Sequence, residues 1–252
     1  MEWDVKRICL CLCLLFLSPG ALADDDKIRV GPSVPADDAL AQNKSADDLV
    51  KQSRELLSVC IVKSGCPSAE TPEKAETLAL QALAIDADNI EARMQMAIAI
   101  SMQARDMPMG KARKERVAER MKAYAESVLK DDPGNAWAHG FLAVWHVEVR
   151  RRGGMIGAAI MGASLDKART HFAYAEKSAP DNLILRWQYA RALAALDPER
   201  FDDEIRAQLQ DVSTLTCQDQ IEQAVQKRAE KLLGAIQQKQ FAFAETFANT
   251  QM

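Results

Sequence analysis

The stretch that decides the fold is residues 131–148, which read DDPGNAWAHGFLAVWHVE. Pro133 cannot continue a helix, and Gly134 tolerates the left-handed turn with which many helices end. Asn135 is a residue type that caps the free backbone N–H groups of a new helix. An apolar face that includes Trp145 then follows at helical spacing. The stretch therefore predicts the end of one helix, a tight turn and the start of the next.

The same pattern of a turn that ends in a capping asparagine occurs twice more along the chain. Asn89 and Asn182 end similar turns, and they lie 46 and 47 residues from Asn135 (135 − 89 and 182 − 135). The 252 residues are 48% hydrophobic and include only 11 Gly and 9 Pro, which favours a folded and almost wholly helical protein. We therefore predict an all-α chain built from a repeated pair of helices.

The chain offers no pattern that is typical of an enzyme, a metal site or a cofactor site. His139 and His146 are seven residues apart, whereas zinc-binding helices place two histidines four apart. Glycine-rich phosphate loops and nucleophile elbows are missing from the sequence. The net charge of −4 gives no support for nucleic-acid binding. We expect a non-enzymatic protein without metal or cofactor.

The N-terminus has the pattern of a secretory signal peptide. Lys6 and Arg7 precede an apolar run over residues 8–17, and a small-residue site ends at Ala23. The apolar run is too short to cross a bilayer as a mature helix. We expect residues 1–23 to be removed after Ala23 and the protein to be exported, to the periplasm in a bacterial host.

The remaining chain divides into a linker and one helical domain. Residues 24–44 are polar and lack periodicity, so we expect a disordered linker, and residues 45–252 form the helical-repeat domain. Caps and apolar spacing predict helices over residues 45–63, 72–85, 90–105, 111–129, 136–151, 165–178, 183–196, 199–212 and 218–245.

Three cysteines follow the signal peptide. A turn separates Cys60 from Cys66, so the two can form a disulfide in an oxidising compartment. The alternative is that Cys60 is a small buried apolar residue on a helix face and forms no bond. Cys217 has no partner in either case.

Aligned on the three asparagines, each unit resembles a tetratricopeptide repeat. A small residue stands where the two helices of a repeat touch, namely Ala97, Ala143 and Ala190. The second helix of the family's pattern is matched by Ala168, Phe172, Ala175 and Pro180. The resemblance implies antiparallel helix pairs in a right-handed superhelix, closed here by a C-terminal capping helix. The usual period is about 34 residues, so each unit carries roughly a dozen extra residues.

A closer resemblance covers about residues 70–200. The motifs that carry it are Ala138-His139, Leu142-Ala143, Trp145-His146, Glu148-Val149 and, after a long connection, Leu165-Asp166-Lys167-Ala168. They are similar to the regulator-of-microtubule-dynamics family and its bacterial relatives. An exported protein meets no cytoplasmic tubulin, so we do not extend the microtubule role to this chain.

The resemblance also implies which side chains face the concave groove of the array. They are Met94, Ile98, Met102, Trp137, Val144, Val147, Glu148, Trp187 and Arg191. This mostly apolar surface suits an amphipathic helix of a protein partner, so we expect a binding or scaffold module. Two alternatives remain. The groove residues can be ordinary core, or the protein can bind a small molecule or lipid like the periplasmic component of a solute transporter.

One connection allows two interpretations. Arg150, Arg151 and Arg152 precede the loop expected over residues 153–164, GGMIGAAIMGAS. Such a basic triplet next to an apolar stretch can touch an anionic membrane. We favour the alternative that the loop folds over the groove and fills it with four side chains, Met155, Ile156, Ile160 and Met161. Oligomeric state and partner identity are not predicted.

Overall fold

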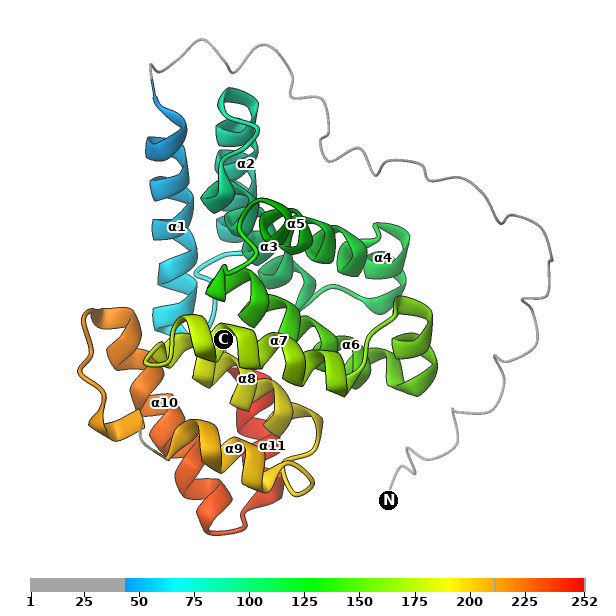
Figure 1. The fold of residues 1–252 in the computed structure, drawn as a ribbon, viewed down its shortest axis with the longest axis vertical. Coiled ribbons are helices and arrows are strands. Elements are labelled where there is room, and N and C mark those ends of the chain that lie inside the picture. The colour runs from blue at the N-terminus through cyan, green and yellow to red at the C-terminus, as the bar shows by residue number, and fades with distance from the viewer. Residues whose placement is uncertain (1–43, 211, 252) are drawn as a thin grey trace, which may run out of the picture. The chain divides into compact units, whose positions relative to one another are not determined.

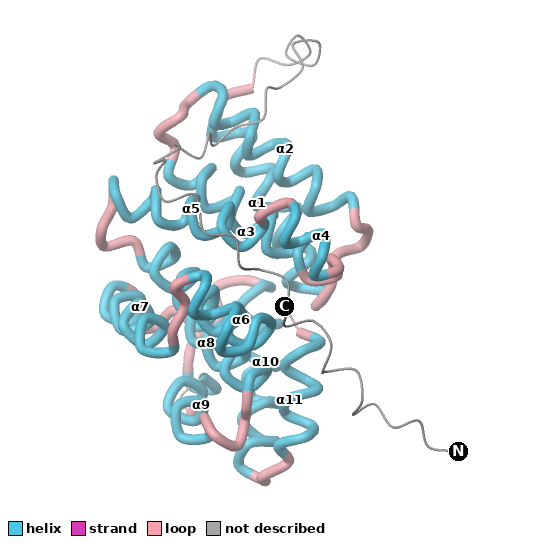
Figure 2. The backbone as a smooth tube through the Cα atoms, turned by 90° about the vertical axis from the view of Figure 1, so that its right-hand side faces the viewer, coloured by secondary structure: helices cyan, strands magenta, loops and turns pink. Residues whose placement is uncertain are grey.

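The structure is a computed structural model that describes residues 44–210 and 212–251. All regular secondary structure in these two ranges is helical, which confirms the all-α prediction (Figure 2). The expected signal peptide, residues 1–23, and all but the last residue of the expected linker lie outside the described residues. The α-helices are α1 Ala46–Lys63, α2 Glu70–Ile85, α3 Ile90–Ala104, α4 Met109–Lys114, α5 Val117–Asp131, α6 Ala136–Met161, α7 Leu165–Ser178, α8 Leu183–Leu196, α9 Asp202–Leu209, α10 Gln220–Gln237 and α11 Phe241–Thr250, and a 3-10 turn spans Val212–Thr214.

The helices pack as consecutive pairs (Figure 1). The pairs are α1 with α2, α3 with α5, α6 with α7, and α8 with α9. Neighbouring pairs meet through α2 against α3, α5 against α6 and α6 against α8. The last two helices turn back over this array, because α10 contacts α1 and α11 packs on α8. Arg228 of α10 donates to the carbonyl of Val62 at 2.7 Å, which joins the start of the domain to its end.

Each of the three predicted asparagine caps starts a helix. The side-chain oxygens of Asn89, Asn135 and Asn182 accept backbone N–H bonds at the starts of α3, α6 and α8, over 2.8 to 3.1 Å. A second bond recurs with them. The residue four places after each asparagine donates to a carbonyl six places before itself, over 2.9 to 3.0 Å. These bonds run from Arg93 to Ala87, from His139 to Pro133 and from Arg186 to Pro180.

Small residues allow the helices to approach closely. Ala97, Ala143 and Ala190 are all fully buried. Gly140 has a packing role as well, because a Cβ atom at this position would lie 2.6 Å from Leu185 Cδ2. The largest core cluster runs from α6 to α11, and its fully buried side chains include Trp187. Most of the stability therefore comes from contacts between helices rather than within them.

The prediction of a single helix over 111–129 is wrong. The structure contains α4 and α5 instead, separated at Arg116, whose φ of 49° lies in the left-handed region. That conformation ends α4 and turns the chain into α5, which begins with the buried side chain of Val117. The sequence carries no Gly or Pro at this point, so the local pattern gives no sign of the break.

The prediction of a loop over 153–164 is also wrong. The helix α6 interrupts its regular geometry only at Gly154, with φ 62° and ψ −161°, and then continues to Met161. The side chains of Met155, Ile156 and Ile160 do not fill a groove, since they are 73–76% exposed. Glycine adopts the positive φ without strain, and the apolar and alanine residues beyond it restart the helix.

The prediction of one long final helix over 218–245 is wrong as well, because the chain breaks into two helices here. The chain forms α10 and then α11, with a turn at Lys239, whose φ is 56°. The expected 199–212 helix is shorter than predicted, since α9 covers Asp202–Leu209. The turn at Lys239 allows α11 to fold back against α8, where Ala244 and Ala248 become buried.

Candidate functional site

The structure divides the predicted groove residues among separate parts of the core. Met94 packs with Val128 and Ala138, whereas Ile98 and Met102 pack beside the cluster at the α1–α2–α3 contact. Five others lie together on α6 and α8, namely Val144, Val147, Glu148, Trp187 and Arg191. Trp137, in the first turn of α6, is 43% exposed. Thus α6 and α8 provide the largest part of a common surface, which we call the groove surface.

The C-terminal helix α11 packs on the α8 part of this surface. Ala244 and Ala248 of α11 belong to the same core cluster as Val147 and Trp187, which are fully buried. Phe247 meets the Trp187 ring edge-on, with 6.5 Å between the ring centroids. The groove surface therefore holds an amphipathic helix, and that helix belongs to the chain itself.

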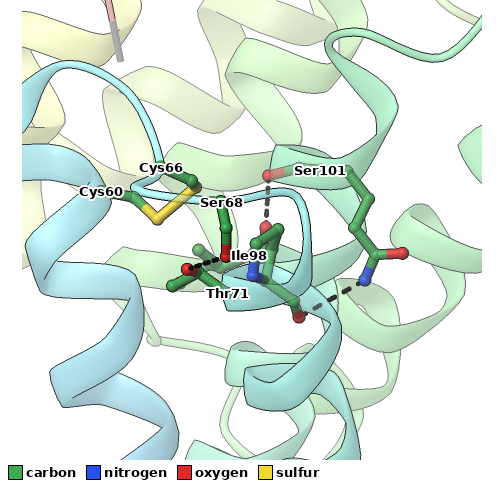
Figure 3. Close-up of a disulfide and its surroundings, with 8 residues drawn as sticks. Cys60, Cys66, Ser68, Thr71, Ile98 and Ser101 are labelled. Atoms are coloured by element: carbon green, nitrogen blue, oxygen red, sulfur yellow. Dashed lines mark hydrogen bonds between the residues drawn. A yellow bond between two sulfur atoms is a disulfide. The ribbon is translucent and has the colours of Figure 1, made fainter.

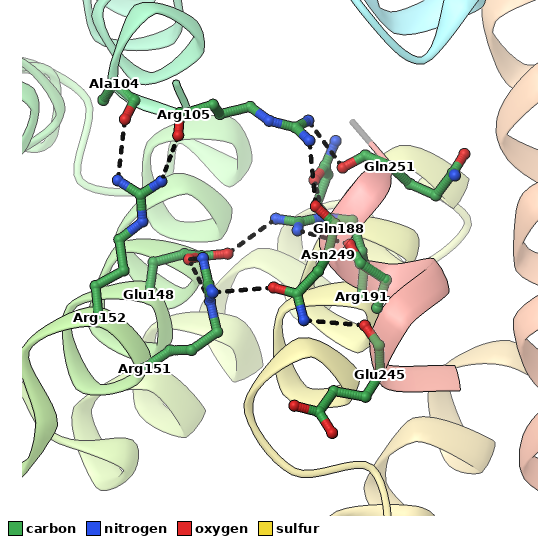
Figure 4. A network of polar contacts seen from close by, with 11 residues as sticks. Ala104, Arg105, Glu148, Arg151, Arg152, Gln188, Arg191, Glu245, Asn249 and Gln251 are labelled. Carbon is green, nitrogen blue, oxygen red and sulfur yellow. Dashed lines mark hydrogen bonds and ion pairs between the residues drawn. The ribbon is translucent and has the colours of Figure 1, made fainter. Parts of the chain in front are cut away.

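Two arginines hold the C-terminal end of α11 (Figure 4). Arg191 of α8 donates to the carbonyl of Ala248 at 3.4 Å, and Arg105, just after α3, donates to the carbonyl of Gln251 at 2.9 Å. The last carbonyls of a helix have no partner within the helix and carry partial negative charge. The cations therefore complement the helix end, much as a charged binding site would hold a bound peptide.

One carboxylate lies among these arginines. Glu148 accepts two bonds from Arg151, over 2.9 and 2.7 Å, and one from Arg191 over 3.3 Å. Arg151 reaches onward to the side chain of Asn249 on α11, over 2.9 Å. Burial alone would raise the pKa of the Glu148 carboxyl, but the charges of Arg191 and Arg151 outweigh it and hold that pKa below its usual range. Glu148 is therefore an anion that connects α6, α8 and α11.

We predict that Glu148→Gln lowers the free energy of unfolding by about 1–2 kcal/mol, measured by urea denaturation. The amide keeps the shape of the side chain but leaves the Arg151 and Arg191 charges without their counter-charge. The exposed Glu245 on α11 provides the control, because only its backbone carbonyl joins the network. Equal stabilities of Glu148→Gln and Glu245→Gln would contradict the role given to the Glu148 charge.

All three histidines of the chain meet between α6 and α7. His139 Nε2 donates to the Pro133 carbonyl over 3.0 Å, and its Nδ1 lies 2.9 Å from His171 Nδ1. His146 stacks on His171 and is 2% exposed, and its Nδ1 has no hydrogen-bond partner in the described part of the chain. Within these residues no group of three or more His, Cys, Asp or Glu is arranged to hold a metal ion.

Cys60 and Cys66 form a disulfide (Figure 3). It closes the turn between α1 and α2, with the two Cα atoms 4.2 Å apart. Ser68, in the same connection, shares a hydrogen bond of 3.2 Å with Thr71 in the first turn of α2. Cys217 is a free thiol that donates to Gln226 Oε1 at 3.3 Å.

Arg105 and the separate helix α11, on which the arrangement depends, were not predicted from the sequence. The available signal was the spacing of Phe243 with Phe247 and of Ala244 with Ala248, which gives α11 an apolar face of its own. Comparison with protein-family models, curated proteins and solved structures finds no match for this chain. The interpretation of the site therefore depends on its geometry.

Proposed function

We propose that this protein is an exported, non-enzymatic binding module, built as a tetratricopeptide-like array, that holds an amphipathic helix of a protein partner on its groove surface. The observation that carries the proposal is the seating of α11. This helix packs on α8, where Phe247 meets the Trp187 ring, and two arginines bind its terminal carbonyls. A surface that accepts one helix in this way has both the apolar floor and the charged end that helix recognition needs. The partner helix takes the place of α11.

Local geometry supports the repeat architecture. The three asparagine caps and the three carbonyl bonds six residues back recur at matching positions of α3, α6 and α8. The buried Ala97, Ala143 and Ala190 occupy the close-approach position of the tetratricopeptide pattern. The resemblance to the regulator-of-microtubule-dynamics family remains a proposal about descent and fold.

The disulfide supports export. Cys60 and Cys66 are bonded, and such bonds persist mainly in oxidising compartments outside the cytosol. The proposed periplasmic location depends on this bond together with the signal-like pattern of residues 1–23.

The experiment that tests the groove uses α11 itself as the probe. Phe247→Glu places a charge against Trp187 and should release α11. A fluorescent peptide of residues 239–251 is then expected to bind the variant at least about tenfold more tightly than the wild type. The wild-type groove is protected by its own tethered helix, whose effective concentration is on the order of millimolar. Fluorescence anisotropy measures both affinities.

Phe243→Glu is the matched control. Phe243 is 44% exposed on the same helix, so its replacement should leave α11 seated and the peptide excluded. If the folded Phe247→Glu variant fails to bind the peptide, the groove surface does not accept a helix from outside and the proposed function is wrong. Native mass spectrometry of protein purified from its own cells then identifies a bound partner, and a retained small molecule in place of a protein would argue against the proposal.

A further inference from the structure

The far end of α6 exposes a compact group of large apolar side chains. Met155, Ile156 and Ile160 are 74%, 73% and 76% exposed. Ile156 and Ile160 are four residues apart on one face of the helix, and Met155 lies beside them. Single exposed apolar residues are common on protein surfaces, whereas exposed apolar side chains gathered in one patch favour an interaction site.

The other face of this segment is anchored. Ala158 is buried with Trp145 in one cluster, against which Met161 and Met121 pack. The Trp145 indole N–H donates to the carbonyl of Ala118 at 2.8 Å and fixes the ring. The exposed side chains are therefore held outward by a packed helix and do not belong to a loose loop.

A cationic helix lies near this apolar group. Met109, which begins α4, precedes Met155 by 46 residues (155 − 109), the same interval that separates the Asn89 and Asn135 caps. Thus α4, between α3 and α5, and the far end of α6, before α7, occupy equivalent positions in adjacent units. Figures 1 and 2 place both on the same side of the domain. Met109 is 55% exposed. The cations of residues 109–116 are Lys111, Arg113, Lys114 and Arg116, of which Lys111 pairs with Glu115 and Arg116 with Glu119.

An open pocket beside the apolar group adds more positive charge. Its volume is about 400 Å³, and its polar lining consists of Ser164, one carboxylate, Asp166, and three arginines, Arg150, Arg169 and Arg200. Arg169 pairs with carboxylates, whereas Arg150 forms no ion pair within residues 44–210 and 212–251. The whole chain has a net charge of −4, so this cationic end is a local departure from an acidic molecule.

We propose that the outer end of α6 together with α4 docks on the surface of an anionic phospholipid bilayer. Met155, Ile156 and Ile160 enter the boundary between headgroups and acyl chains, and the pocket at Arg150 receives a lipid phosphate. Apolar side chains surrounded by cations are the composition that interfacial anchors use, and a free phosphate would not engage the apolar part. The acidic remainder of the protein is repelled and orients this end toward the lipid. The proposal does not depend on the groove.

No helix in the described part of the chain is both long and apolar enough to cross a membrane.

Flotation with vesicles tests the proposal, using protein purified from its own cells with its N-terminus as processed there. Wild type is expected to float with vesicles of equal parts phosphatidylcholine and phosphatidylglycerol, and much less with phosphatidylcholine alone. The double variant Ile156→Asn, Ile160→Asn should bind at least about tenfold more weakly, because it loses the two aliphatic side chains that enter the bilayer. Arg150→Gln should bind about fivefold more weakly, with a smaller dependence on salt.

Ile85→Asn provides the matched control, since Ile85 is 60% exposed at the end of α2 and should not affect flotation. The urea midpoint of the double variant should stay at the wild-type value, because both isoleucines are exposed. Equal flotation of wild type and double variant would overturn the proposal. Equal flotation of wild type with both kinds of vesicle would also overturn it. If sedimentation shows a wild-type dimer that the double variant loses, without vesicle binding, the apolar group is an interface between two copies and the membrane proposal is wrong.

Discussion

Trp187→Ala is expected to lower the free energy of unfolding by about 3–5 kcal/mol, the range for removing a fully buried aromatic side chain. Trp187 of α8 has no exposed surface, and its ring meets Phe247 of α11 within the core. The alanine leaves a cavity that neighbouring helices can collapse into only in part. The same change removes a contact of α11, so we expect the backbone amides of α11 to lose protection from hydrogen exchange first. Urea denaturation measures the loss of stability, and hydrogen exchange shows which helices lose it.

Trp137→Ala is the matched control, because Trp137 is 43% exposed in the first turn of α6. Its replacement should change the free energy of unfolding by less than about 0.5 kcal/mol. Equal losses for the two tryptophan variants would contradict the difference in burial between the two rings. A small loss for both would have the same meaning.

The second large effect is a loss of stability in mild acid that depends on His146. Burial above all, together with the charges of His171, Lys167 and Lys122, lowers the pKa of this imidazole to about 4. The unfolded value is about 6.5, so between these two pH values the unfolded chain binds the proton more readily. Stability is therefore unaffected above about pH 6.5 and falls as the pH decreases toward 4, by about 3 kcal/mol in all.

His146→Leu removes this titration. The His146 Nδ1 atom has no partner to lose within the described residues, and leucine has a similar volume. Urea midpoints from neutral pH to about pH 4.5 should fall much less in the variant than in wild type. Some dependence remains, because burial also lowers the pKa of His171, as does the charge of His139. An identical decline in both proteins would show that His146 is not buried in its neutral form.

The sequence predicted those elements that local chemistry determines. Asn89, Asn135 and Asn182 cap helices because a short polar side chain bonds the free N–H groups of its own first turn, and no distant contact is required. The helical composition likewise favoured an all-α chain. The breaks at Arg116 and Lys239 were not predictable in this way. Neither residue prefers a left-handed backbone, so tertiary packing must stabilise it there.

The candidate site depended still more on tertiary contacts. The repeat pattern identified Val147, Glu148, Trp187 and Arg191 as one surface, and the structure brings them together on α6 and α8. The pattern contained no information on what covers that surface. Arg105 binds a carbonyl 146 residues further along the chain, and a partner at that separation leaves no periodic signal.

By itself, the sequence determined the helical class and the starts of α3, α6 and α8, because caps and apolar spacing act within one or two turns. Only the tertiary structure decided that α11 occupies the groove surface and that the end of α6 faces outward. Both outcomes depend on which of several apolar faces pack together. That choice is made by the fit of side chains such as Trp187 with Phe247 and Trp145 with Ala158, across separations that local propensities do not reach.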